Sequence, residues 1–422
     1  MLVSYLLAEK NVFSPGFIIC SVFTLSALFV ALNGKNWGYS ISLEALLYII
    51  LALAVTLLGI RGGTKVKLHS STNAYHRSNM SGNIGSRTML ILSVFSVIIV
   101  YVYYKHQMAL SVSLGNSSGF SGMIYTIRSH VYDEGVYHLG IFLNLGISFL
   151  RAVGFISVFL FIKQLVVEKR VEWRYVLPMI SLVLYFVLTT GRSGFISLLC
   201  AIMYYFYYSF RKIGKNIRPT KTVLYIIIGF IAFLFLFWQL GKLTGKNTVL
   251  SLWDTISIYI GSSILCFDKL ICSLIDFNYV GSYTFKGLYN IFAKLGFPVI
   301  EVGNHAEMIL FNGYSSNVFT AFASYYRDYG PLMSFFFIFV AGFIIGVLWK
   351  KFKDARGDLA FAIIYGRYIA TAVAMYSISE NLFSALLALN AIAECFFVFF
   401  IIRISFKRNA TDYSFCIDNK MS

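Results

Sequence analysis

Residues 301–330 combine a histidine, three acidic residues and an arginine beside a long apolar run, and these types fit acid–base chemistry. Histidine titrates nearest neutral pH, so His305 is a candidate general base, with Glu307 as a second candidate. Arg327 and Asp328 close the segment and could bind an anion and accept a proton. Two other interpretations stay open. His305 could be an ordinary loop histidine, and Arg327 with Asp328 could be a helix-entry pair at a membrane interface.

Two arginines elsewhere have surroundings that fit anion binding. Arg192 stands in the turn TTGRSGF between two apolar runs, and Ser193 follows at the expected start of a helix. Free N–H groups at a helix start and a guanidinium both favour anions. Arg151 lies inside an apolar run, where its guanidinium could hold phosphate oxygens. Alternatively, Arg192 anchors the chain at lipid headgroups, and Arg151 bonds backbone carbonyls or lines a wet cavity.

Arg367 and Glu394 are charged residues inside apolar runs, where charge is costly unless it is paired or serves a site. Each lies about eight residues from the expected cytoplasmic end of its run. At ~1.5 Å per residue, both are then roughly 12 Å from that face. Their matching depth predicts a structural ion pair between neighbouring helices.

Several motifs that indicate a bound nucleotide, a metal ion or a redox pair are absent from the sequence. There is no G-x-x-x-x-G-K-[ST], H-E-x-x-H, D-x-D or C-x-x-C. The sequence therefore predicts no metal and no cofactor. If the protein is an enzyme, we expect its substrate to arrive already activated.

The elements that position these residues are membrane spans. Hydrophobic residues make up 58% of the 422 residues and charged residues 13%, which excludes a soluble globular enzyme, a disordered chain and a small disulfide scaffold. The apolar residues form ten runs near the ~20 residues that a crossing helix needs. We expect an all-α integral membrane protein, because lipid cannot bond an exposed backbone. The expected spans are 14–32, 43–60, 88–104, 141–162, 175–190, 193–210, 222–240, 331–349, 359–379 and 382–402.

The expected architecture is a polytopic bundle of about 10–11 transmembrane helices, forming a single membrane domain over residues 1–422. Residues 1–8 are apolar but too short to cross, so they are either the remnant of an eleventh helix or an interfacial segment. The net charge is +17, but most Lys and Arg outside the runs occupy every second connection. That alternation is typical of cytoplasmic loops, so both termini are expected in the cytoplasm and no nucleic-acid partner is implied.

Two sizeable loops are expected on the outer face, 105–140 and 241–330. The second is too long to be structureless. Its stretch SLWDTISIYIGSSILCFDKLI has helical apolar spacing interrupted by polar residues and glycine. The pattern predicts helices that lie at the membrane surface or re-enter the protein.

Several segments resemble one family. NVFTAFASYYRDYG, residues 317–330, followed by a glycine-containing span, resembles the oligosaccharide repeat-unit polymerases, which are the bacterial O-antigen (Wzy-type) polymerases. Their usual pattern has Tyr where this chain has Phe319, and Phe where it has Tyr329. TTGRSGFISLL, KNVFSP, and ISIYIGSSILCFDKLI with Tyr259, Gly261 and Asp268 also resemble segments of that family.

The resemblance implies a GT-C-like glycosyltransferase of lipopolysaccharide biosynthesis in the bacterial inner membrane, with a large periplasmic loop. Such enzymes transfer a growing glycan from undecaprenyl pyrophosphate to a lipid-linked repeat unit at the periplasmic face, without metal or nucleotide. The implied partners are the undecaprenyl-pyrophosphate-linked oligosaccharide, membrane lipid and a polysaccharide chain-length regulator. The other interpretations are a lipid-linked oligosaccharide flippase or solute transporter, an O-antigen ligase, and a non-catalytic assembly factor.

Under this interpretation, residue types suggest roles. Positive charge would stabilise the leaving pyrophosphate, through Arg192 and Arg327 first and Arg151 third. His305 is the first candidate base, with Asp328 and Glu307 behind it, although the family motif does not carry His305 over. The expected substrate-binding residues are Asn317, Tyr259 and Tyr326, and Trp253 and Tyr283 could also stack on sugars.

Overall fold

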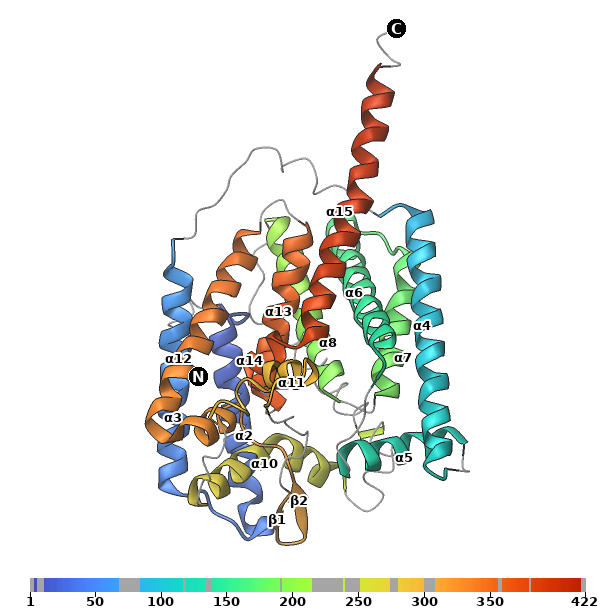
Figure 1. Cartoon of the computed structure of the whole chain (residues 1–422). Helices are drawn as coiled ribbons and strands as arrows, with labels where there is room; N and C mark the ends of the chain where they lie inside the picture. The colour runs from blue at the N-terminus through green and yellow to red at the C-terminus, as the bar shows by residue number, and fades with distance from the viewer. Residues whose placement is uncertain are drawn as a thin grey trace.

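Helices dominate the computed structural model, and most of them stand side by side in one bundle (Figure 1). The structure describes residues 4–5, 11–67, 84–116, 119–133, 139–189, 192–214, 238–239, 251–273, 280–299, 308–355, 359–378 and 381–418.

Within those residues, 8 helices are long and apolar enough to cross a membrane. The chain is therefore an all-α multi-pass membrane protein. Seven of these helices fall on predicted runs: α2 (Pro15–Trp37), α3 (Leu43–Lys65), α4 (Ser86–Ser113), α6 (Ile141–Lys163), α8 (Arg192–Lys212), α12 (Ala323–Asp354) and α13 (Leu359–Ile378). The eighth is α10 (Leu252–Cys272).

The remaining described elements are shorter or divided. A π-helical turn, Gln164–Glu168, extends α6, and a 3-10 turn, Trp173–Tyr175, leads into α7 (Val176–Leu188). The predicted loop 105–140 contains α5 (Gly119–Asp133). The predicted loop 241–330 contains α10, α11 (Lys286–Lys294), the strands β1 (Ile309–Phe311) and β2 (Tyr314–Ser316), and the start of α12.

Two predicted spans do not correspond to a single described helix. The prediction of a single span over 382–402 is wrong, because the structure divides it into α14 (Leu382–Leu386) and α15 (Leu389–Asp418). Asn381 caps α14 by accepting a hydrogen bond from the Ser384 amide, so a new helix starts there. Apart from 238–239, the predicted span 222–240 lies outside the described residues.

Helices α3 and α12 make the closest backbone contact that the glycines define. A Cβ added at Gly59 would lie 2.4 Å from the Phe339 carbonyl oxygen, and one at Gly63 would lie 2.1 Å from that of Phe343. From α12, a Cβ at Gly342 or Gly346 would meet the carbonyl oxygen of Thr56 or Ile60 at 2.5 or 2.2 Å. Glycines four apart on both helices thus let the two backbones touch, as small residues do in membrane helix pairs.

Helix α10 forms in the stretch where the sequence predicts surface or re-entrant helices. It runs across the ends of the upright helices, near α5 and the β-hairpin (Figure 1). The Ser251 hydroxyl caps it by accepting from the Asp254 amide. Trp253 donates through Nε1 to the Asn33 side chain over 2.9 Å, which joins the start of α10 to α2.

Buried Asp268 fixes the other half of α10 to the connection between α2 and α3. Its carboxylate accepts from the Tyr39 hydroxyl at 2.9 Å and from the Ser42 amide at 3.2 Å, and also from the Ser42 hydroxyl. Ser42 is also the N-cap of α3, with its side chain bonded to the Ala45 amide. Burial, and then the bond to Asp268, raise the pKa of the Tyr39 phenol, so it remains a donor.

The hairpin of β1 and β2 was not predicted, although the sequence carries its signal. Asn312 and Gly313 both have positive φ, 43° and 81°, and Asn-Gly is the preferred pair for such a two-residue turn. The Asn312 side chain donates to the Asn36 carbonyl at 2.8 Å, and Ser316 bonds Ser262 of α10 at 2.8 Å. The hairpin therefore joins the end of α2 to α10.

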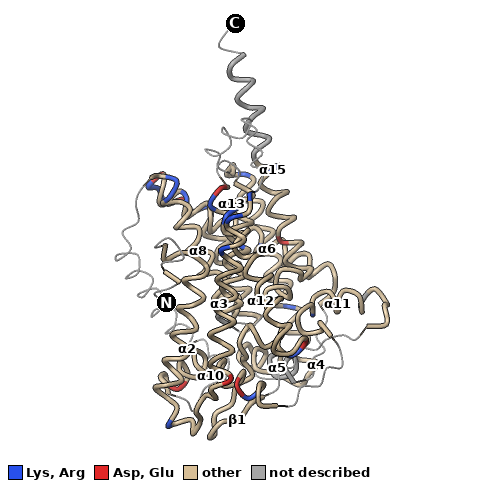
Figure 2. Tube along the Cα trace, turned by 90° about the vertical axis from the view of Figure 1, so that its left-hand side faces the viewer, with Lys and Arg blue, Asp and Glu red and all other residues tan. Residues whose placement is uncertain are grey.

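Charge is distributed unevenly between the two ends of the bundle. Figure 2 shows most Lys and Arg gathered at the end from which α15 projects, whereas the end that holds α10 carries fewer of them, mixed with acidic residues. At the basic end, Lys350 of α12 donates to the Val66 carbonyl just after α3, at 2.5 Å. This distribution agrees with the alternating connections of the sequence.

The glycine contact generates a stability prediction. We expect Gly63→Ala to lower the melting temperature of the detergent-solubilised protein, because overpacking a close contact costs about 1–3 kcal/mol. The matched control is Gly62→Ala on the same helix, where a Cβ would meet Phe343 at an ordinary 3.5 Å. Equal melting temperatures for the two variants would contradict the contact.

Candidate functional site

The segment around Arg327 forms a short arm at the start of α12. Inside this helix Gly330 has φ 69° and ψ −177°, and Pro331 follows it. Positive φ suits glycine, and proline cannot donate the hydrogen bond that a continuous helix needs. Residues 323–329 are therefore set at an angle to the rest of α12, as an arm that carries Arg327 and Asp328.

Asp328 fastens this arm to the segment before α11. Its carboxylate is 4% exposed and accepts from the backbone amides of Tyr283 at 3.2 Å and Thr284 at 2.5 Å. From the other side, Asn381 donates to the Tyr283 carbonyl at 2.8 Å. Arm, segment and α14 are thus held together at Tyr283, and Asp328 is an anchor with both oxygens occupied.

Arg327 points to aromatic rings and not to its neighbour Asp328. Its guanidinium lies 4.5 Å from the centroid of Phe319 and 5.2 Å from that of Tyr283, which are cation–π distances. Arg327 is half-buried, and the ion pairs among the described residues do not include it. The helix-entry ion pair is therefore not formed, and a positioned positive charge remains without a carboxylate partner in the described part of the chain.

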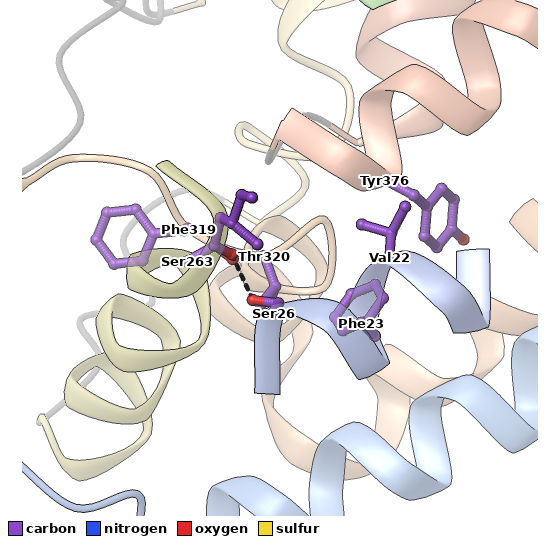
Figure 3. Close-up of a pocket in the computed structure, with 8 residues that line it drawn as sticks. Val22, Phe23, Ser26, Ser263, Phe319, Thr320 and Tyr376 are labelled. Carbon is purple, nitrogen blue, oxygen red and sulfur yellow. Dashed lines mark hydrogen bonds between the residues drawn. The ribbon is translucent and has the colours of Figure 1, made fainter. Parts of the chain in front are cut away.

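A small pocket adjoins the same segment, between α2, α10 and α13 (Figure 3). Phe319 and Thr320 line it, together with Ser26, whose hydroxyl donates to the Ile260 carbonyl at 2.6 Å. The Thr320 hydroxyl is buried and has no hydrogen-bond partner among the described residues. Phe319 therefore contacts both the cation and this pocket.

The three expected substrate-binding residues differ in exposure. Asn317 is half-buried and lies two residues before Phe319, and Tyr259 is half-buried on α10. Tyr326 is 8% exposed, and its ring packs edge-to-face against Tyr48 and Phe267 at centroid distances of 5.3 and 5.8 Å. The structure thus places Tyr326 in the core and leaves Asn317 and Tyr259 partly accessible.

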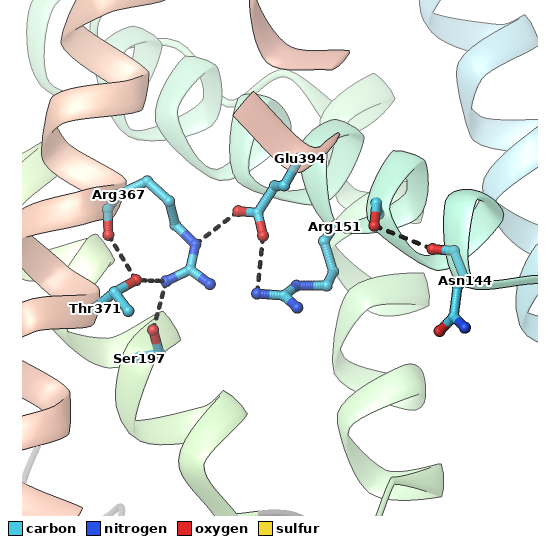
Figure 4. A network of polar contacts seen from close by, with 7 residues as sticks. Asn144, Arg151, Ser197, Arg367, Thr371 and Glu394 are labelled. Atoms are coloured by element: carbon cyan, nitrogen blue, oxygen red, sulfur yellow. Dashed lines mark hydrogen bonds and ion pairs between the residues drawn. The ribbon is translucent and has the colours of Figure 1, made fainter. Parts of the chain in front are cut away.

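A second charged group lies within the bundle. Arg367 of α13 donates through Nε to Glu394 of α15 at 2.7 Å, which is the pair that matching depth predicts. Arg151 of α6 reaches the other oxygen of Glu394 through Nη2 at 2.8 Å. Figure 4 shows both guanidinium groups directed at this one carboxylate. We call Arg151, Glu394 and Arg367 the charged cluster.

Sequence reasoning found no acidic partner for Arg151, and the structure gives it Glu394. Depth alone could not reveal this, because it does not say that α6 packs along both α15 and α13. Reasoning from the sequence also missed Asn381, whose contact with Tyr283 spans 98 positions of the chain. Only the Asn-before-apolar-run pattern of a helix cap marked it.

Three other predicted site residues lie wholly or partly outside the described part of the structure. His305 and Glu307 lie outside the described residues. Arg192 is the first residue of α8, and its side chain lies outside the description. Ser197, five residues later on α8, accepts from Arg367 at 2.5 Å, so the start of α8 lies within roughly 8 Å along the axis from the charged cluster. Within the described residues, no group of three or more His, Cys, Asp or Glu could hold a metal ion.

Comparisons with known proteins give no relative for this chain. No family model matches, and neither the curated proteins nor the solved structures contain a match. The class that the structure itself defines is a multi-pass, all-α membrane protein.

The charged cluster generates a stability prediction. Glu394→Gln leaves two arginines within the bundle without their shared carboxylate, and breaking such a buried pair costs about 3–5 kcal/mol. We expect a lower melting temperature and a lower yield of monodisperse protein. The control is Glu172→Gln, which removes a partly exposed pair with Arg174 at 3.2 Å and should cost less than about 1 kcal/mol. Similar losses in the two variants would refute the role of Glu394.

Proposed function

We propose that this protein is an O-antigen or related polysaccharide polymerase of the bacterial inner membrane. In this proposal it transfers a growing glycan from undecaprenyl pyrophosphate to a lipid-linked repeat unit at the periplasmic face. The observation that carries the proposal is the guanidinium of Arg327, framed by Phe319 and Tyr283 without a carboxylate partner among the described residues. This cation stands in the segment 317–330, which resembles the polymerase family.

The proposed chemistry needs positive charge on one side and a base on the other. The bond between the sugar and the pyrophosphate oxygen breaks, and the leaving pyrophosphate keeps the electron pair. Preorganised cations stabilise that developing charge, and we assign this to Arg327 with Arg192. The acceptor hydroxyl forms the new glycosidic bond and gives its proton to a base, for which His305 and then Glu307 are the candidates.

Two predicted residues take different places in this proposal. Asp328 accepts two backbone amides, so it serves as a positioning residue that holds Tyr283 beside Arg327. Arg151 already shares Glu394 with Arg367, so its place as third pyrophosphate ligand has less support than those of Arg192 and Arg327.

The proposed orientation places both termini in the cytoplasm. The excess of Lys and Arg at the end from which α15 projects supports this, since cytoplasmic connections are basic in multi-pass proteins. Helix α12 runs from the Arg327 arm to Asp354 at the basic end, so the arm would face the periplasm. A polysaccharide chain-length regulator remains the proposed protein partner.

A transporter of lipid-linked oligosaccharide is the second candidate. The charged cluster favours it, because ionisable residues within a membrane bundle often mark a transport path. An O-antigen ligase would use a similar donor with a different acceptor. The three candidates differ in whether the purified protein makes polymer.

The activity test uses purified protein in nanodiscs with undecaprenyl-pyrophosphate-linked repeat units, without nucleotide or metal. We expect a ladder of polymer on a gel from the wild type. Arg327→Gln should reduce the rate at least ~10²-fold, as removal of one charge-stabilising donor does. Arg61→Gln, an exposed arginine at the basic end of α3, should leave the ladder unchanged. Intact substrate without polymer would favour the transporter, and transfer to an added lipid acceptor without a ladder would favour the ligase.

The orientation has its own test. Leu310, in β1 of the hairpin, is 73% exposed. We expect the variant Leu310→Cys to react with a membrane-impermeant thiol reagent added to spheroplasts. Arg61→Cys should react only after the membrane is opened. Both changes are made in a variant whose native cysteines are serine. The reverse labelling pattern would overturn the proposed topology.

A further inference from the structure

The charged cluster carries one more positive than negative charge. Arginine stays protonated throughout the physiological pH range, and Glu394 is the acid that Arg151 and Arg367 share. Neither arginine is paired with any other described acid. An excess cation inside a membrane bundle costs free energy unless water or an anion meets it.

The two arginines satisfy their N–H groups unequally. Arg367 donates to Glu394, Ser197 and Thr371, and its guanidinium lies 4.0 Å from the centroid of the Phe155 ring. Arg151 reaches Glu394 through Nη2. Its buried Nε has no hydrogen-bond partner among the described residues. Because a guanidinium carries five N–H donors, Arg151 has the capacity to bind a further acceptor.

Arg151 is also the accessible member of the cluster. Its side chain is 20% exposed, compared with 8% for Arg367 and 3% for Glu394. Asn144 and Ser148 precede it on α6 at spacings of seven and three residues, so the three share one helix face. This polar strip begins near Ile141, the first residue of α6, in an otherwise apolar helix.

From these observations, we propose that Arg151 is the centre of a binding site for one anionic group of the phosphate class. The site is separate from that of Arg327. The anion would accept hydrogen bonds from Nε and the other N–H groups of Arg151 that Glu394 does not occupy, and it would neutralise the excess charge of the cluster. Its source is either a free inorganic anion or the headgroup of an anionic lipid. The inference holds for a polymerase, a transporter or a ligase alike.

The first test measures anion-dependent stability of the full-length protein in an uncharged detergent. The melting temperature is followed against sodium phosphate, with ionic strength kept constant by the sodium salt of a bulky sulfonate. We expect a rise that grows with the logarithm of the phosphate concentration above the dissociation constant and reaches about 1–2 °C at tenfold excess. Arg151→Gln, made in an Arg327→Gln background so that the proposed pyrophosphate site does not contribute, should abolish the rise, because it removes the charge and the guanidinium donors.

Two further variants make this result specific. Arg327→Gln should keep the phosphate response, because it leaves Arg151 intact. Arg151→Lys keeps the charge but loses the planar set of donors, so it should respond with roughly tenfold weaker affinity. It also replaces Arg151→Gln if that variant does not fold. A response that survives when Arg151→Gln is added to Arg327→Gln, or that disappears in Arg327→Gln alone, would overturn the proposal.

The source of the anion is decided in nanodiscs. With phosphatidylcholine alone, a free anion gives the same phosphate response as in detergent. A lipid headgroup instead gives a rise only when phosphatidylglycerol is added, again lost in Arg151→Gln. No response to phosphate or to phosphatidylglycerol in the wild type would refute the site. Because the readout is binding, a failed polymer assay leaves this result standing.

Discussion

The backbone contact between α3 and α12 is the constraint on which the arrangement of this bundle most depends. Lipid offers little hydrophobic drive for helices to associate, so close packing must supply it, and Gly59, Gly63, Gly342 and Gly346 permit it. Helix α3 starts at Ser42, where Asp268 attaches α10. Helix α12 starts with the arm of Arg327. The contact between α3 and α12 therefore sets where α10 and the arm that carries Arg327 lie.

Three buried carboxylates hold distant segments of the chain together, each through a different set of donors. Asp268 accepts from hydroxyls and an amide, Asp328 from two amides, and Glu394 from two arginines. Each joins segments that are distant in the sequence. Because these acids are occupied in holding the fold, positive charge is left over at Arg327 and Arg151. Both proposals for anion binding rest on this surplus.

The surroundings of Arg327 and Arg151 compensate the positive charge in different ways. At Arg327, the rings of Phe319 and Tyr283 orient the guanidinium without neutralising it. At Arg151, the single negative charge of Glu394 offsets one of the two positive charges of Arg151 and Arg367. One positive charge therefore remains, shared by the two guanidinium groups. The first arrangement suits a transient, highly charged leaving group, and the second suits a single resident anion. A cation on an aromatic face and a cation beside a carboxylate thus favour different ligands.

The sequence by itself determined the helical membrane class, because the length and apolarity of a run are local properties that a bilayer reads directly. It also determined the Arg367–Glu394 pair, since depth can be counted along a helix. Only the tertiary structure decided that Arg151 shares Glu394, that Asp328 turns from Arg327 to amides some 45 positions away, and that the run 382–402 divides beside Tyr283. Those outcomes depend on which helix faces meet, and that is set by contacts between residues far apart in the chain.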